Sequence, residues 1–184
     1  DAVVIGGGVN GTSVAFHLAK AGLTDVVLLE RWHLAAGATG KSGALVRMHY
    51  TNEPETRLAY ESLPYFQHWD DMVGGDCGFE PVGTMIFAPA AHRAKMEAIL
   101  DIQRNVGVNS RMVTPEEAKE IDPAVHADEG DSIAYEPESG YADGHATTFG
   151  FAKAAQSMGV TVMEYTRAMR VLTEGDRVVG IETS

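Results

Sequence analysis

The pattern of apolar and polar positions at the start of the chain predicts a strand, a helix and a second strand. Apolar runs occupy residues 2–5 and 26–29, and such continuous runs are typical of strands buried on both faces of a parallel sheet. Between them a helix is expected over residues 10–21, ending at Gly22. The apolar residues that recur there at helical spacing are Val14, Leu18 and Ala21. These elements predict one βαβ unit with a right-handed crossover.

The rest of the chain shows further helix and strand patterns without an internal repeat. Residues 31–44 are rich in small residues and are expected to form a long loop, which in a compact domain is often functional. Helices are expected to begin near Asn52, Ala91, Thr114 and Ala146. Strands are expected over residues 79–88, 133–136, 160–163, 167–172 and 178–181, the last two forming a hairpin. The helix after Asn52 is expected to kink at Pro64 and to bury Leu58, Phe66, Trp69 and Val73.

Two changes in this pattern predict the domain organisation. A parallel α/β start gives way near residue 52 to mixed helices and strands, and an α/β pattern returns near residue 145. We therefore expect an α/β fold: a Rossmann-like domain in two segments, residues 1–52 and 143–184, the second incomplete. The portion 53–142 is expected to belong to an inserted α+β domain.

The sequence Gly6-Gly7-Gly8-Val9-Asn10-Gly11 is the first candidate for chemistry. In a G-x-G-x-x-G motif the first glycine permits a sharp turn, the second admits a pyrophosphate and the third lets helix and strand pack closely. The helix amides after the turn, beginning at Val9 and Asn10, favour the phosphates. Glu30 follows the second strand, where a carboxylate can accept the ribose hydroxyls and would repel the 2′-phosphate of NADP. The strand and helix around the motif favour dinucleotide binding over a plain glycine-rich turn.

The composition of the chain excludes some classes of binding partner. The chain has 184 residues, and 26 acidic against 14 basic residues give a net charge of −12. Such an acidic chain is not expected to bind nucleic acid, and no apolar run has the length of a membrane span. One cysteine, Cys77, excludes an internal disulfide and fits a reducing compartment. We expect a cytoplasmic fragment of a longer protein, with a mitochondrial location left open because Asp1 is not a methionine.

Longer stretches of the sequence resemble a known family. The pattern from Gly6 to Glu30 looks like the N-terminus of FAD-dependent oxidoreductases of the D-amino-acid oxidase family. The stretch GATGKSGALVRMHY, residues 37–50, resembles the second flavin-contacting segment of the sarcosine oxidase and dimethylglycine dehydrogenase branch. YEPESGYAD, residues 135–143, resembles the segment where this branch returns from its substrate domain. The likeness is greatest to the β subunit of heterotetrameric sarcosine oxidase.

The resemblance implies that the dinucleotide is FAD and that residues 53–142 belong to a substrate domain. It places Gly43 and Ala44 near the flavin. Some relatives attach the flavin to a histidine in the second segment, where this chain has Lys41, so non-covalent FAD is expected. The other candidate cofactor-binding residues are Arg31, Thr39, Gly40 and Ser42. Partner subunits are implied by the resemblance to a subunit of a larger enzyme.

Arg47 and His49 are the candidate catalytic residues. Arg47 matches an arginine that binds the substrate carboxylate in this branch, and a guanidinium suits a carboxylate chemically. A surface salt bridge and a contact to the flavin phosphate are the alternatives for Arg47. His49 would act as an acid–base or electrostatic group, and the alternative is a surface loop histidine. No residues have the spacing of metal ligands, so no metal is expected.

The resemblance implies an FAD-dependent oxidoreductase acting on the C–N bond of a small amino acid or N-methylated amine such as sarcosine or dimethylglycine. A hydride would pass from the carbon beside nitrogen to the flavin. One alternative is another substrate on the same fold: glycine, a D-amino acid or glycerol 3-phosphate. The other is a domain that binds a dinucleotide without turnover.

Overall fold

The computed structural model describes residues 1–23 and 25–184, which divide into two units. The first unit comprises residues 1–44, 68–78 and 142–184, and the second comprises residues 45–67 and 79–141. The inserted portion was expected to comprise residues 53–142. The structure differs, because residues 45–52 lie in the second unit and residues 68–78 return to the first.

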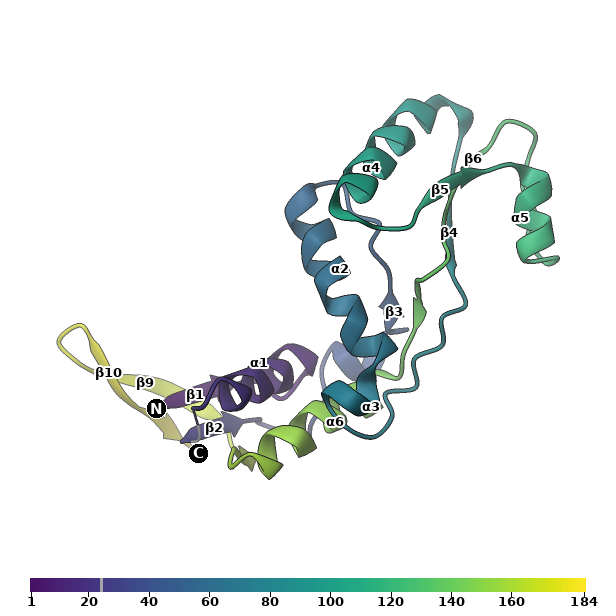
Figure 1. Ribbon diagram of the computed structural model, residues 1–184. Helices are drawn as coiled ribbons and strands as arrows, with labels where there is room; N and C mark the ends of the chain where they lie inside the picture. Colours follow the sequence, from purple (N-terminus) through teal and green to yellow (C-terminus); the bar gives the residue numbers. More distant parts are fainter. Residues whose placement is uncertain (24) are drawn as a thin grey trace. The chain divides into compact units, whose positions relative to one another are not determined.

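The first unit is built on a parallel sheet of three strands in the order β1-β2-β8 (Figure 1). The strands are β1 (Ala2–Ile5), β2 (Val26–Leu29) and β8 (Thr161–Met163). Helix α1 (Val9–Lys20) connects β1 to β2 and packs against α6 (Gly144–Ser157), which precedes β8. The parallel pairing of β1 with β2 confirms the predicted βαβ unit.

Two details of this unit contradict the sequence-based expectations. The residues of α1 that are buried are Thr12, Ala15, Phe16 and Ala19, whereas Val14 is 50% exposed. The buried face of α1 is set by its packing against a second helix as well as against the sheet. Val3 and Ile5 are also exposed, so β1 is covered on one face only and is not buried on both.

Aromatic side chains form part of the core beside α6. Phe151 of α6 lies with its ring centroid 5.3 Å from that of Phe16 and 4.8 Å from that of Trp69. Trp69 begins the short helix α3 (Trp69–Met72). A Cβ on Gly150 would approach the indole of Trp69 to 2.8 Å, so this contact requires glycine. The packing of Trp69 on α6 explains why residues 68–78 belong to the first unit.

An antiparallel hairpin completes the first unit. It pairs β9 (Ala168–Glu174) with β10 (Arg177–Thr183), drawn in yellow in Figure 1. The hairpin was predicted from the turn Glu174-Gly175-Asp176, where Gly175 has a positive φ of 60°. Of the helices in the described ranges, none combines the length and apolar character needed to cross a membrane.

The second unit contains an antiparallel sheet in the order β4-β6-β5. Its strands are β4 (Thr84–Ala88), β6 (Ser132–Glu136) and β5 (Arg111–Val113). A second pair joins β3 (Leu45–Val46) to β7 (Gly140–Tyr141). Strands β3 and β5 were not predicted, because two or three residues are too few to show a period.

The helices of the second unit are α2 (Glu53–Gln67), α4 (Arg93–Val106) and α5 (Pro115–Ile121), and the 3-10 turn η2 (Ala90–His92) leads into α4. Neighbouring residues of β6 belong to different clusters. Ala134 packs with Met96 and Leu100 of α4, whereas Ile133 packs with Val113 and Ala118. This alternation is the period of a strand covered on both faces.

Helix α2 differs from its predicted apolar stripe. Leu58 is 71% exposed, and the buried residues of α2 are Thr56 and Leu63. Leu63 packs with Met48 and Val108. The helix continues past Pro64 and ends at Gln67, so the predicted stripe spanned two separate helices, α2 and α3. The predicted capping box is present at the start of α5, where Thr114 and Glu117 exchange hydrogen bonds.

The glycine turn after β1 gives the first testable prediction. A Cβ on Gly11 would lie 1.8 Å from the carbonyl oxygen of Gly6, both of them on backbone that cannot rotate away. Gly11→Ala should therefore lower the free energy of unfolding of the full-length protein by about 3 kcal/mol or more. Gly37→Ala is the control, because a Cβ there meets nothing within 4 Å. Thermal and denaturant unfolding of both variants measures the difference, and equal stabilities would refute the packing argument.

Candidate functional site

The turn between β1 and α1 has the geometry predicted for a pyrophosphate cradle. Gly6 has a positive φ of 110°, which lets the chain turn at the end of the strand. Gly8 is the N-terminal cap of α1. A Cβ added at this position would lie 3.1 Å from the hydroxyl oxygen of Thr39. The amides of the first turn of α1 point out of the helix end without intrahelical partners. A helix N-terminus of this kind binds the phosphates of a dinucleotide.

The loop after β2 folds back onto this turn. The amide of Ala35 donates to the carbonyl of Gly7 at 2.9 Å, and Ala35 adopts a positive φ of 60° to do so. The hydroxyl of Thr39, in the short 3-10 turn η1 (Thr39–Lys41), accepts the amide of Val9 at 3.1 Å. The predicted residues Gly8, Val9 and Thr39 are therefore brought together at the start of α1.

Glu30 joins the two parts of the site. Its Oε2 accepts the amide of Gly7 at 2.7 Å, and its Oε1 accepts the amide of Trp32 at 2.9 Å. A carboxylate has about four acceptor positions, so these two bonds leave capacity for ribose hydroxyls. Glu30 thus fixes the glycine turn against the loop, a role that the sequence motif did not indicate.

A cavity of about 350 Å³ lies at the carboxyl ends of the parallel strands. Its lining residues are Ile5, Gly6, Leu29, Glu30, Arg31, Thr166, Arg167 and Ala168. In open α/β sheets ligands bind at this edge, so the cavity suits the adenosine part of a dinucleotide. Thr166 and Arg167 were not predicted. Their position just after the third parallel strand is the signal that could have identified them.

The remaining predicted cofactor residues differ in how far they are buried. A Cβ on Gly40 would lie 2.8 Å from the imidazole of His145, so this glycine packs closely at the start of α6. Ser42 accepts the amide of Ala44, which has a positive φ of 47°. Asn10, Lys41 and Gly43 are exposed. No structural feature of the protein alone assigns these exposed residues to the cofactor, and their roles stay predictions.

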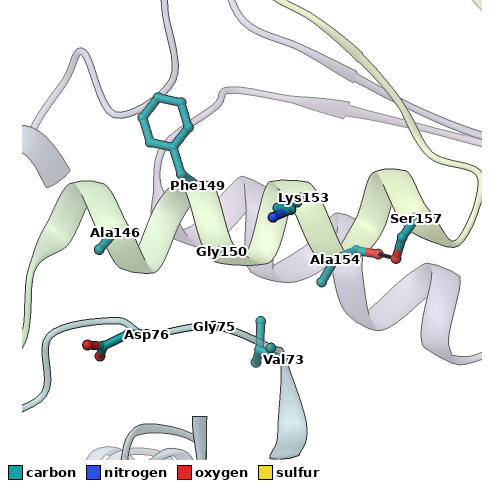
Figure 2. A pocket seen from close by; sticks show the side chains of 10 residues that line it. Val73, Gly75, Asp76, Ala146, Phe149, Gly150, Lys153, Ala154 and Ser157 are labelled. Carbon is teal, nitrogen blue, oxygen red and sulfur yellow. Dashed lines mark hydrogen bonds between the residues drawn. The ribbon is translucent and has the colours of Figure 1, made fainter. Parts of the chain in front are cut away.

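A larger cleft of about 470 Å³ lies elsewhere on the first unit, between α6 and residues 73–76 (Figure 2). Phe149 and Lys153 line it from α6 and Asp76 lines it from the loop. The amide of Gly74 is bonded to the carbonyl of Trp69, and that of Gly75 is bonded to Asp70. None of the predicted cofactor residues lines this cleft.

Arg47 and His49 lie in the second unit, on the segment that follows β3. The guanidinium of Arg47 donates to the carbonyl oxygen of His49 and lies 5.1 Å from the ring centroid of Tyr50. Such stacking restricts the side chain and leaves the other N–H donors of the guanidinium for a ligand. Among the described residues Arg47 forms no ion pair, which disfavours the alternative of a surface salt bridge.

His49 is not a surface histidine. Its side chain is 11% exposed, and its Nδ1 lies 3.4 Å from Oε1 of Glu136, within ion-pair distance. Glu136, at the end of β6, is fully buried. Glu136 lies in the stretch YEPESGYAD, but no role was predicted for it. An acidic residue in an otherwise apolar strand is the feature of the sequence that could have identified it.

Three further donors converge on Glu136. Its Oε2 accepts the amide of Met48 at 3.0 Å and the hydroxyl of Ser139 at 2.7 Å, and its Oε1 accepts Nε2 of Gln103. Burial raises the pKa of Glu136, but the nearby imidazole of His49 and the hydrogen bonds from Ser139, Met48 and Gln103 together outweigh it and hold the pKa below its ordinary value. The carboxylate is therefore kept ionised in the interior.

No cluster of three or more His, Cys, Asp and Glu side chains suited to a metal ion is found in residues 1–23 and 25–184.

The glycine turn, the parallel sheet and the acid after β2 define a dinucleotide-binding protein of the Rossmann type. The comparison with protein families refines this class. The model of the FAD dependent oxidoreductase family (DAO) matches residues 1–184. The chain therefore belongs to this family, and its dinucleotide is FAD.

Individual relatives agree with this assignment. The β subunit of sarcosine oxidase from an Arthrobacter species is 28% identical over 100% of this chain and 47% of its own length. The mitochondrial pyruvate dehydrogenase phosphatase regulatory subunit of Mus musculus is 29% identical over 98% of this chain and 21% of its own length. Among solved structures, L-proline dehydrogenase from P. horikoshii superposes with a TM-score of 0.92 at 29% identity, over 100% of this chain and 48% of that one. The chain thus spans half or less of the length of these relatives.

The contact of Glu30 with the glycine turn gives a prediction on the cofactor. Glu30→Gln leaves one acceptor oxygen where the carboxylate has two, so the dissociation constant for FAD should rise about tenfold. Titration of the full-length apoprotein with FAD, followed by flavin fluorescence, measures it. Asp176→Asn, at the exposed tip of the hairpin, is the control with the same chemical change. Equal FAD affinity in the Glu30 variant would remove Glu30 from the site.

The buried carboxylate gives a prediction on pH. Because the pKa of Glu136 is lower in the folded protein, ionised Glu136 stabilises the fold fully above the unfolded pKa of about 4.3. This stabilisation is lost as the pH falls through the folded pKa. Glu136→Gln should therefore reduce the free energy of unfolding by about 2 kcal/mol near neutral pH, and the gap to wild type should narrow in acid. Denaturant unfolding across this range checks it, with Glu138→Gln as the control. A gap independent of pH would contradict it.

Proposed function

We propose that the full-length protein is an FAD-dependent oxidoreductase that oxidises the C–N bond of a small amino acid or N-methylated amine, such as sarcosine or dimethylglycine. The observation that carries this proposal is Arg47, whose guanidinium stacks on Tyr50 beside the largely buried His49. A restrained guanidinium suits the carboxylate that such substrates carry. The relative named as a sarcosine oxidase subunit supports the choice of substrate class.

Within this proposal the residues of the chain bind and orient. The turn at Gly6–Gly11, with Glu30 and Thr39, would hold the pyrophosphate and ribose of FAD. Lys41, in place of a histidine, favours non-covalent attachment. The flavin, once bound, supplies the acceptor for the hydride of the substrate. Arg47 would bind the substrate carboxylate and so fix the orientation of the reacting carbon.

His49 would act as an acid–base or electrostatic group. It lies beside the ionised carboxylate of Glu136, at 3.4 Å. A buried carboxylate at this distance restricts the orientation of the imidazole ring, which the proposed role requires. Partner subunits, a cytoplasmic location and a substrate-binding role for the second unit, residues 45–67 and 79–141, are further parts of the proposal.

A second candidate function is a flavin-binding subunit without turnover. The observation that favours it is the mouse relative, which is named as a regulatory subunit and matches 98% of this chain. The same glycine turn and Glu30 would then serve FAD binding alone.

The two candidates differ in one measurement. The purified full-length protein should be yellow, and anaerobic addition of sarcosine or dimethylglycine should abolish its visible flavin absorbance. Arg47→Ala should retain the flavin but raise KM for the amine about a hundredfold, because a charged hydrogen-bonding partner worth about 3 kcal/mol is lost. Arg57→Ala is the matched control, since Arg57 pairs with Glu53 on the exposed surface of α2.

Each alternative has its own outcome. A yellow protein that no amine or amino acid bleaches would favour the regulatory subunit. Bleaching by proline, glycine or a D-amino acid alone would keep the enzyme class and change the substrate. An unchanged KM in Arg47→Ala would remove Arg47 from the substrate site.

A further inference from the structure

Glu136 is a buried carboxylate whose partners come from several separate parts of the second unit. It lies at the end of β6 with no exposed surface. It accepts hydrogen bonds from Met48, Ser139 and Gln103, the last of which is a fully buried side chain of α4. His49 is the fourth neighbour, at 3.4 Å. Two of these four partners, Met48 and His49, are consecutive residues next to Arg47.

Residues 47–50 contact one another, and two of them also contact Glu136. The guanidinium of Arg47 donates to the carbonyl of His49 and stacks on Tyr50, so the position of Arg47 follows that of the backbone beside it. That backbone is fixed by the bond from the Met48 amide to Glu136 Oε2. The ring of His49 faces the other oxygen, Oε1. One carboxylate thus restrains the backbone and the ring of the segment that carries both candidate catalytic residues.

Stability alone does not explain a carboxylate at this place. Met48, Leu63 and Val108 form an apolar cluster at the same segment, and a well-packed apolar residue is often as stable as a buried charge or better. A buried acid that is supplied with four partners is instead suited to fixing one conformation. The bond from Ser139 and the contact of its hydroxyl with the Met48 sulfur, at 3.9 Å, add to this restraint.

We propose that Glu136 is a positioning residue, which acts through Met48 and His49 to hold Arg47 in the orientation that binds the substrate carboxylate. This inference rests on the proposed function of Arg47. Glu136 itself does not touch the substrate. Substitution of Glu136 should therefore weaken carboxylate binding in a protein that has Arg47, but not in a variant that lacks it.

The test is a double-mutant cycle on the FAD-loaded full-length protein. The probe is acetate, a carboxylate without an amine, and calorimetry measures its dissociation constant. Glu136→Gln keeps the shape of the side chain but offers one acceptor oxygen in place of two, and it should weaken acetate about fivefold to tenfold. In the Arg47→Lys background, where no planar fork remains to be oriented, the same change should alter acetate binding less than about twofold. Glu138→Gln, two residues away, should have no effect in either background.

A second readout is independent of any ligand. Hydrogen exchange of the Met48 amide should accelerate in Glu136→Gln while the amides of α4 keep their protection, and a melting curve establishes that the variant is folded at the assay temperature. Unchanged acetate binding in Glu136→Gln would overturn the inference, and so would exchange of the Met48 amide that does not accelerate. So would an effect on acetate that is equally large in the Arg47→Lys background, because it would not pass through Arg47.

Failure of the proposed function has a different signature. If Arg47→Lys alone binds acetate as tightly as the wild type, Arg47 is not the carboxylate site, and the positioning role falls with it. If Arg47→Lys weakens acetate binding but Glu136→Gln does not, the proposed function stands and only the inference about Glu136 is lost.

Discussion

The contact between Gly11 and the carbonyl of Gly6 is the constraint on which the first unit depends. No side chain fits at Gly11, since a Cβ would lie 1.8 Å from that oxygen. The close approach allows α1 to begin directly beside the end of β1, and the loop after β2 then closes on the same turn through Ala35 and Thr39. The shape of the glycine turn, the candidate cradle for the cofactor, is therefore a consequence of how strand and helix pack.

Two carboxylates organise the two units in a similar way. Glu30 accepts two backbone amides and joins the glycine turn to the loop, and Glu136 accepts the Met48 amide and joins β6 to the segment with Arg47. In both cases the negative charge is stabilised by N–H and O–H donors rather than by lysine or arginine. The chain has a net charge of −12, and uncharged donors of the backbone and of side chains stabilise these two carboxylates. Each acid thereby fixes a loop whose residues could meet a ligand.

The family and the proposed activity depend on different evidence. Membership of the FAD dependent oxidoreductase family follows from a match over the whole chain, and the cradle at Gly6–Gly11 gives that match a physical basis. The relatives that are similar in sequence to this chain include both a protein named as an oxidase subunit and a protein named as a regulatory subunit. Under the proposed function, substrate choice would depend on side chains of the second unit, above all Arg47 and His49. A shared fold hosts different chemistries in this way because the site, and not the scaffold, selects the substrate.

The sequence by itself determined the local elements and the dinucleotide motif. Glycine spacing, the acid after β2 and the capping box at Thr114 act over a few residues, so they can be recognised in a single chain. The tertiary structure alone decided which faces are buried. Val14 is exposed and Thr12 is buried because α1 also packs on α6, a contact between residues more than a hundred positions apart in the sequence. The hydrogen bonds of Glu136 also depend on the tertiary structure. Its partners Met48 and Gln103 are distant in sequence and meet it only when β6, α4 and the segment after β3 pack together.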